Sequence, residues 1–176
     1  MECNERDIVL NFVRADGNNL RYASEKMKDN KEVVLTAVKQ YGYALEYASN
    51  KLKNDKEVVL EAVKQDGSAL ELASDELKND KNIVLEAVKQ NGYVLRLASK
   101  KMKNDKEIVL EAVKENGFAL NYASERLQAE FKEKGIEEIE REVNGMTTIK
   151  TDGKCYSKIK QTPKSIELTV GRVEKA

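Results

Sequence analysis

The chain has 176 residues, of which 35% are charged and 40% are hydrophobic, and its 31 acidic residues balance 31 basic ones. This length suits one domain with a buried core. The balanced charge argues against a broadly basic nucleic-acid binder and against a protein held at a membrane surface by a polybasic face. The chain has no histidine and only two cysteines, Cys3 and Cys155. We therefore expect no Cys/His metal site, no structural disulfide and no cofactor.

The sequence contains no targeting or membrane-spanning pattern. No apolar run approaches the ~20 residues that a membrane-spanning helix needs. Residues 1–17 lack the basic start and the apolar centre of a secretory signal peptide. We therefore expect no membrane association and a cytoplasmic location.

Five copies of a 25-residue unit follow one another between Asn4 and Gln128. The clearest copy, residues 55–79, reads DKEVVLEAVKQDGSALELASDELKN. Three rows fix the period: Leu10, Leu35, Leu60, Leu85 and Leu110; Gly17, Gly42, Gly67, Gly92 and Gly117; and the Ala-Ser pairs that begin at Ala23, Ala48, Ala73, Ala98 and Ala123. Self-similarity at this period predicts a stacked array in which each unit buries its apolar face against its neighbours.

Each copy is expected to begin with an amphipathic helix. Apolar residues recur from Val58 to Val63 at i, i+3 and i+4 spacing with charged residues between them, which predicts about three helical turns. Capping boxes are predicted at the start of these helices, with Asp29, Asn54 and Asn104 as caps opposite Glu32, Glu57 and Glu107, and with Asn79 as a cap opposite Asn82. We expect each helix to end at the recurring glycine, in a left-handed conformation.

A second helix is predicted directly after the glycine, from Ser68 to Leu77. Its recurring alanines are interpreted as packing positions, because small side chains let helices approach closely. The serine that follows Ala73 would lie in mid-helix. Its hydroxyl is expected to bond back to the preceding helical turn or to lie in a tight contact between helices. The alternative is that the serines of the five copies form a row of hydroxyls that faces a ligand.

The motif DxxVVLxAVxxxGxALxxAS over residues 4–128 resembles a tandem-repeat family catalogued as a domain of unknown function in bacterial and protist proteins. The first copy departs from it at Asn11 and Phe12, as suits a capping unit. The resemblance implies a helical array and no activity. We predict a mainly α fold, an αα-hairpin solenoid of five 25-residue repeats with a small C-terminal α/β or β cap.

The repeats are followed by an acidic stretch, residues 129–143, which we predict to be a capping helix. Its apolar residues are expected to cover the open end of the stack. They are Phe131, Ile136, Ile139 and Val143.

Residues 144–176 are predicted to form a small basic module that ends in a β-strand. Alternation of apolar and polar residues from Ser165 to Val173 predicts that strand, whereas residues 151–161 suit either a helix or a strand. If they are helical, residues 136–173 resemble the C-terminal half of a PDZ domain, which implies a peptide-binding fragment. The glycine loop and the peptide-pairing strand of that family should precede this segment, but solenoid sequence occupies their place.

The types of residue that the chain contains argue against an enzyme. Without histidine there is no Ser/His or Cys/His pair for nucleophilic catalysis. Single glycines at 25-residue intervals do not form a phosphate-binding loop. The acidic residues at the helix starts are explained by capping and by the helix dipole.

A protein or peptide partner is the better-supported expectation. Aromatic residues recur near the glycine of several copies, and the candidate contact residues are Tyr43, Tyr47, Tyr93, Phe118 and Tyr122. They either fill gaps between helices or form an exposed ladder that binds an extended peptide or a helix. A single-stranded RNA-binding repeat protein is the alternative. The mixed charge of the repeats argues against it, because Glu46 and Glu71 occupy positions that are Arg21 and Arg96 in other copies.

The tail gives the first testable prediction. Residues 144–176 are too few to hold a core alone, since domains below ~40 residues normally need disulfides, metals or a partner. We expect a monomer in which the tail docks on the fifth copy, so that deleting residues 144–176 lowers the melting temperature without changing the particle mass measured by light scattering. An unchanged melting temperature would contradict docking, and a change from dimer to monomer would instead identify the tail as a dimerisation element.

Overall fold

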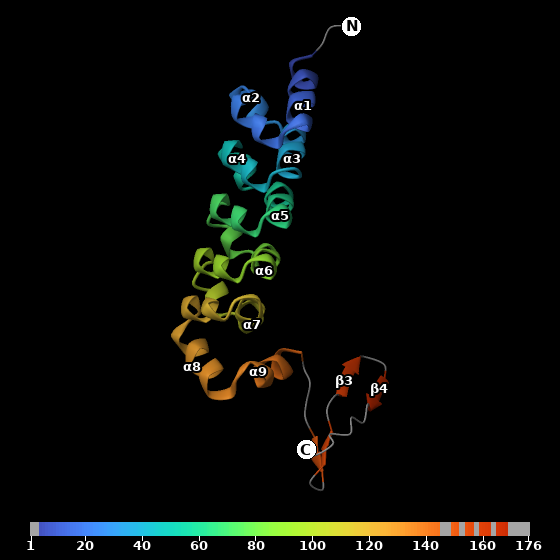
Figure 1. The fold of residues 1–176 in the computed structure, drawn as a ribbon, viewed down its shortest axis with the longest axis vertical. Coiled ribbons are helices and arrows are strands. Elements are labelled where there is room, and N and C mark those ends of the chain that lie inside the picture. The colour runs from blue at the N-terminus through green and yellow to red at the C-terminus, as the bar shows by residue number, and fades with distance from the viewer. Residues whose placement is uncertain (1–3, 145–148, 152–153, 157–158, 163–164, 169–176) are drawn as a thin grey trace. The chain divides into compact units, whose positions relative to one another are not determined.

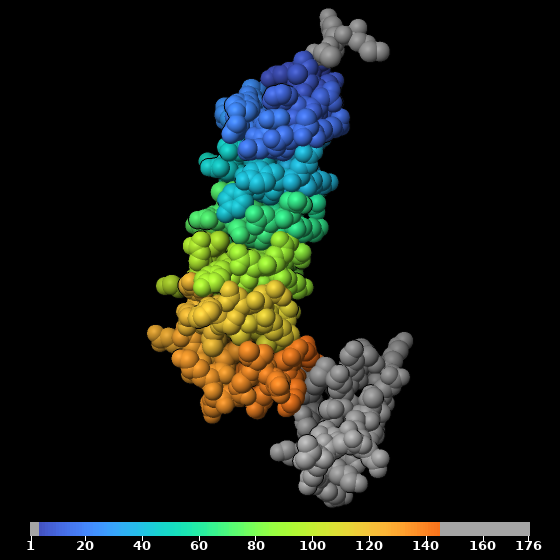
Figure 2. Space-filling model, in the orientation of Figure 1, coloured from blue at the N-terminus to red at the C-terminus, as the bar shows by residue number. Residues whose placement is uncertain are grey.

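The computed structural model describes residues 4–144, 149–151, 154–156, 159–162 and 165–168 (Figure 1). The chain divides into two compact units, residues 1–127 and 128–176, which are described separately. The first unit is a solenoid of five helical layers, one per sequence copy, and Figure 2 shows these layers succeeding one another in chain order. The predicted helical repeat fold is confirmed.

Each layer contains a long α-helix and a 3₁₀ helix, and in the first four layers a short helical turn follows. The long helices are α1 (Glu5–Ala15), α3 (Lys31–Val38), α5 (Lys56–Gln65), α6 (Lys81–Gln90) and α7 (Lys106–Glu115). The 3₁₀ helices are η1 (Gly17–Tyr22), η2 (Gly42–Tyr47), η3 (Gly67–Leu72), η5 (Gly92–Leu97) and η7 (Gly117–Tyr122). The short turns are α2 (Glu25–Lys28), α4 (Asn50–Lys53), η4 (Leu77–Asn79) and η6 (Met102–Asn104).

The long helices form where the apolar period predicted them. In α5, Val58, Val59, Ala62 and Val63 are fully buried, as are their equivalents in α3 and α6. Successive long helices contact one another, and so do successive 3₁₀ helices. The core therefore runs through the array as a continuous layer between the two helix rows, and each copy contributes to its neighbour's core.

The N-caps lie one residue later than predicted. Asp55 caps α5 by accepting the backbone N–H groups of Glu57 and Val58 at 3.0 and 3.2 Å. The equivalent caps are Asn30, Asp80 and Asp105. The predicted cap Asn54 and its equivalents have another role, given below.

The recurring glycines are not left-handed helix ends. Among the glycines that the structure describes, only Gly135 has a positive φ, of 76°. A Cβ built on Gly67 would lie 2.7 Å from the carbonyl oxygen of Ala87, and one on Gly42 would lie 2.5 Å from that of Ala62. Glycine is thus required in the first four copies, because the start of the 3₁₀ helix there touches the backbone of the next long helix.

The predicted second helix is broken in the middle. In the third copy it is the 3₁₀ helix η3, after which Ala73 is extended with φ −70° and ψ 157°, and η4 follows. Ser74 therefore does not lie in mid-helix. Its hydroxyl accepts the backbone N–H of Leu77 at 3.3 Å, as an N-cap does.

The serines also join neighbouring copies. The Ser74 backbone N–H donates to the carbonyl of Lys53 at 3.1 Å, and its hydroxyl donates to Asn54 Oδ1 at 2.5 Å. The same pair of bonds recurs at Ser49, Ser99 and Ser124, with backbone distances of 2.9–3.1 Å. The predicted row of serine hydroxyls is therefore occupied within the protein, and Asn54 accepts this bond instead of capping α5.

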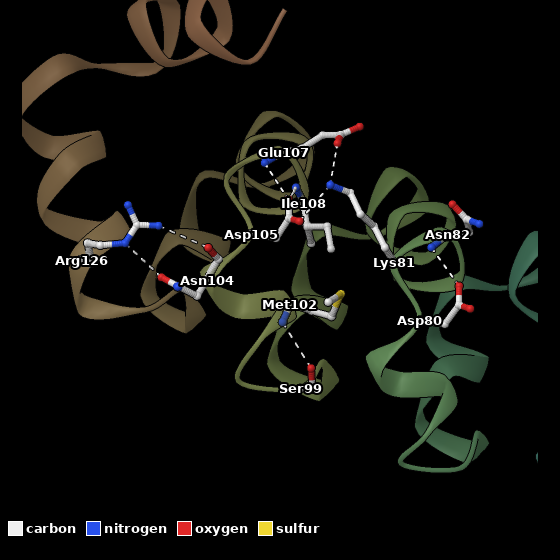
Figure 3. A network of polar contacts seen from close by, with 10 residues as sticks. All are labelled: Asp80, Lys81, Asn82, Ser99, Met102, Asn104, Asp105, Glu107, Ile108 and Arg126. Carbon is white, nitrogen blue, oxygen red and sulfur yellow. Dashed lines mark hydrogen bonds and ion pairs between the residues drawn. The ribbon is translucent and has the colours of Figure 1, made fainter.

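The serine bonds form one ladder between neighbouring copies. A second ladder, made of lysine–carboxylate pairs, joins the long helices (Figure 3). Lys81 Nζ lies 2.8 Å from Asp105 Oδ2 and 2.8 Å from Glu107 Oε2 of the next copy. Lys31 pairs in the same way with Asp55 and Glu57, and Lys56 pairs with Asp80. Each cap carboxylate thus serves its own helix and holds the preceding copy.

Asp105 shows how the ladder affects ionisation. Burial alone would raise the pKa of its carboxyl group, but hydrogen bonds from Lys81 and from the N–H groups of Ile108 and Glu107 together lower that pKa below its ordinary value. The hydrogen bonds from Lys81 to the carboxylates of Asp105 and Glu107 raise the pKa of Lys81. The pair is therefore stabilised in its charged form at neutral pH.

The acidic stretch is divided between two helices instead of forming one. α8 (Glu125–Lys134) begins at the short-turn position of the fifth copy, and α9 (Ile136–Val143) follows the positive-φ Gly135. Phe131 and Ile139 are buried, Val143 is half-buried and Ile136 is exposed. Lys134 connects the two helices, because its Nζ lies 3.3 Å from Glu130 and 2.6 Å from Glu142.

The described tail residues are strands. β1 (Ile149–Thr151) pairs antiparallel with β2 (Lys154–Tyr156), and β3 (Ile159–Thr162) pairs with β4 (Ser165–Leu168). Strands thus occupy the segment where the PDZ resemblance implies a helix. The predicted strand begins at Ser165 as expected, and its residues after Leu168 lie outside the described part of the chain.

We call the interface between two neighbouring copies a joint. The role of the glycine at the joint can be tested with two matched substitutions. Gly67→Ala forces a Cβ against the Ala87 carbonyl, so it should lower the free energy of unfolding by about 1–3 kcal/mol. Gly117→Ala, at the same position of the fifth copy, meets no atom within 4 Å. It should stay within about 0.5 kcal/mol of wild type in urea unfolding. Equal effects of both changes would contradict the close-approach explanation.

The ladder predicts a pH-dependent contribution to stability. Asp105→Asn keeps a capping side chain, as Asn30 shows in α3, but removes the charge that pairs with Lys81. Because the folded pKa of Asp105 is depressed below 3.8, its contribution is present above that value and is lost as the pH falls through the folded pKa. We expect a loss of about 1 kcal/mol or less at pH ~7, shrinking in high salt and at pH ~2.

The control for this change is Asp75→Asn, since Asp75 is exposed and belongs to neither ladder. Thermal unfolding between acid and neutral pH measures both variants. A difference between Asp105→Asn and wild type that does not vary with pH would contradict the electrostatic role of the pair.

Candidate interaction surface

The 3₁₀ helices present a row of outward side chains because their period is three residues. In η2, Gly42 and Leu45 are buried, whereas Tyr43 is half-buried and Glu46 is exposed. Residues two and five of each 3₁₀ helix therefore share its outer edge. We call these positions of the five copies the 3₁₀ face: Asn18 and Arg21, Tyr43 and Glu46, Ser68 and Glu71, Tyr93 and Arg96, and Phe118 and Asn121.

The five candidate contact residues are not equally accessible. Phe118 is 70% exposed and Tyr93 is 41% exposed, so both belong to the protein surface. Tyr43, which also lies on the 3₁₀ face, is half-buried. Tyr47 and Tyr122, at the sixth position of their 3₁₀ helices, are half-buried as well. The surface thus mixes exposed aromatic rings with rings that also pack against the protein.

The aromatic residues form two groups instead of one continuous ladder. The rings of Tyr93 and Tyr122 lie 5.9 Å apart at 57°, which joins the fourth and fifth copies. The rings of Tyr41 and Tyr43 lie 6.3 Å apart in the second copy. The third copy has Ser68 at the corresponding position, so a ligand along this face meets a polar gap between two aromatic groups.

Charges of both signs surround these rings. Arg96 Nη2 lies 3.9 Å from Glu71 Oε2 across the third and fourth copies. Burial, with Glu71 and Asp66 nearby, raises the pKa of the Tyr43 hydroxyl, and Arg96 opposes this shift. The Tyr43 hydroxyl is therefore protonated at neutral pH and can donate a hydrogen bond.

Two exposed tyrosines were not among the predicted contact residues. Tyr22 is 66% exposed, and the guanidinium of Arg21 lies 4.4 Å from its ring centroid. Tyr41 is 46% exposed and occupies the position before the glycine, where the other copies have Asp or Asn. Tyr22 occupies the same repeat position as Tyr47 and Tyr122, so the sequence could have indicated it. Tyr41 occupies a position where the other copies have a capping Asp or Asn, so no recurring aromatic residue pointed to it.

Among the residues that the structure describes, no group of three or more Asp, Glu and Cys side chains is arranged to hold a metal ion. The described helices also include none that is both long and apolar enough to span a membrane.

The repeat geometry agrees with a family model. Four overlapping matches to a domain of unknown function, DUF4116, cover residues 5–53, 30–78, 55–103 and 80–128. The chain belongs to the DUF4116 family. No curated protein and no solved structure matches it.

The matched windows show how DUF4116 relates to the structural layers. Successive windows start 25 residues apart, and each extends over two successive copies. One DUF4116 domain is therefore a pair of layers together with the joint between them. The overlapping windows describe the four joints of the five-copy array, each with its glycine–carbonyl contact and its ladder bonds.

Proposed function

We propose that this DUF4116 protein is a non-enzymatic interaction scaffold that binds a protein or peptide along the 3₁₀ face. The observation that carries the proposal is the exposure of Phe118 and Tyr93 on a framework whose glycine contacts and ladder bonds do not involve them. Large aromatic side chains are favoured contact residues at protein interfaces, because they bury much area with few rotatable bonds.

The arrangement of this face suits an extended partner. The 3₁₀ helices stack in sequence order, so residues at one position recur along the array once per copy. The ladders hold neighbouring copies together, which limits the ordering cost on binding. A peptide laid along the face would meet the Tyr41–Tyr43 group, the polar Ser68 position and then the Tyr93–Phe118 region.

The charge of the face favours protein over RNA. Arg21 and Arg96 are matched by Glu46 and Glu71, and Arg96 already lies beside Glu71. A phosphate backbone is bound mainly through an excess of Lys and Arg. A protein partner with mixed charge fits this pattern better than a polyanion does.

The proposal predicts that exposed rings matter for binding and not for folding. A displayed-peptide library enriched on the full chain supplies ligands, whose Kd is measured by calorimetry. Phe118→Ala combined with Tyr93→Ala should weaken binding about tenfold or more, while the melting temperature and the helical circular-dichroism signal stay close to wild type.

The matched control removes two exposed side chains outside the 3₁₀ face, at Lys39, the C-cap of α3, and at Lys89 of α6. Lys39→Ala and Lys89→Ala should leave Kd unchanged. Equal binding by the aromatic double variant would contradict the proposal. Unfolding of that variant would show that the rings are structural, in which case Phe118→Ala alone, at the most exposed ring, decides the matter. Binding of single-stranded RNA that falls steeply with salt would favour the nucleic-acid alternative.

A further inference from the structure

A shallow hollow lies at the joint between the first and second copies. Its volume is about 370 Å³ and it is open to solvent. The lining residues are Ala15, Asp16, Gly17, Asn18, Gln40 and Tyr41. Ligand clefts of whole small molecules run from ~300 to ~1,000 Å³, so this hollow has the capacity for one long side chain or a similar group.

Two small residues of the first copy border the hollow. Ala15 takes the place of Gln40 and Gln65, and Asn18 takes the place of Tyr43 and Tyr93. Gln40 still reaches back from the second copy, and its Nε2 donates to the carbonyl of Arg14 at 2.8 Å. The joint is therefore held by the same type of bond as the next two joints, where Gln65 and Gln90 donate to the carbonyls of Gln40 and Lys64.

The walls of the hollow combine a carboxylate with an aromatic ring. Asp16 is exposed, and its Oδ1 accepts the Asn18 backbone N–H at 2.9 Å. Tyr41 is 46% exposed, and its neighbour Tyr43 belongs to the 3₁₀ face. Among the lining residues Asp16 carries the only formal charge. A carboxylate and a partly exposed aromatic ring that line one hollow attract cations and disfavour anions.

We propose that this hollow receives an arginine side chain of a protein partner, with its guanidinium against the Tyr41 ring and its N–H groups directed to Asp16. This inference rests on the proposed function, because the hollow adjoins the Tyr41–Tyr43 end of the 3₁₀ face. Arginine fits better than lysine, since its planar fork pairs with a carboxylate and stacks on a ring at once. In the first copy, the Arg21 guanidinium already lies over the exposed Tyr22 ring. A guanidinium–tyrosine contact is therefore compatible with a solvent-exposed site in this protein.

The test uses the full ¹⁵N-labelled chain and the acetylated, amidated tripeptide Gly-Arg-Gly as the probe. Millimolar titration should shift the backbone amide signals of Gly17, Asn18 and Tyr41. The matching tripeptide with citrulline, the neutral isostere of arginine, should not shift them. A response that citrulline reproduces, or no response to the arginine peptide, would overturn the proposal.

Two variants separate the carboxylate from the ring. Asp16→Asn and Tyr41→Asn should each weaken the arginine response about three- to fivefold, as expected for an exposed ion pair and an exposed cation–π contact. Both variants should fold, because Asn91 and Asn116 occupy this position in other copies and accept the same backbone bond. Retained affinity in either variant would count against its assigned role.

The matched control is Asp66→Asn, which removes the same charge at the same repeat position in the third copy. It should leave the response at Gly17 and Asn18 unchanged, and an equal loss there would indicate a general effect of net charge. The tripeptide titration needs no natural partner. The aromatic surface at Tyr93 and Phe118 and the arginine site can therefore fail independently of each other.

Discussion

The contact between one copy's glycine and the next copy's carbonyl oxygen sets the spacing of the whole array. It brings the backbone of η3 against that of α6 at Gly67 and Ala87. At that spacing the Ser74 hydroxyl can reach Asn54, and a lysine can reach the carboxylate cap of the following helix. Because these bonds, the glycine contact and the buried apolar side chains hold the copies together, stacking does not require one particular residue type at the outward positions of the 3₁₀ helices. These positions differ from copy to copy, and some also make contacts across a joint, as Arg96 does with Glu71.

The sequence predicted the array and its long helices because hydrophobic period and repeat length reflect burial directly. It could not assign the glycine's role, since a left-handed residue and a close backbone contact both exclude a Cβ. The caps were misplaced by one residue because Asn54 and Asp55 are both good capping residues, and only the fold decides between them. The break after η3 was missed because neither Ala73 nor Ser74 is a strong helix breaker.

The surface could be predicted by position but not by exposure. Phe118 and Tyr93 stood out because aromatic residues recur after the glycine, yet the sequence could not distinguish them from the half-buried Tyr47. Exposure depends on what the neighbouring copy places opposite each ring, which is a property of the joint. The hollow is lined by Tyr41 together with Ala15 and Asn18. The sequence alone does not bring these residues together, because the hollow is formed only where the first two copies meet.

A repeat array can change one joint without rebuilding the others, because each copy contacts only its neighbours. At the first joint, the bond from Gln40 to the Arg14 carbonyl is kept, while Ala15, Asn18 and Tyr41 differ from the residues at these positions in most other copies. At the third joint, between η3 and η5, the outer edge instead carries Glu71 and Arg96 beside each other. Backbone contacts, buried residues and the two ladders recur from joint to joint, whereas residues two and five of each 3₁₀ helix vary. Five copies of one 25-residue unit therefore present five different local surfaces.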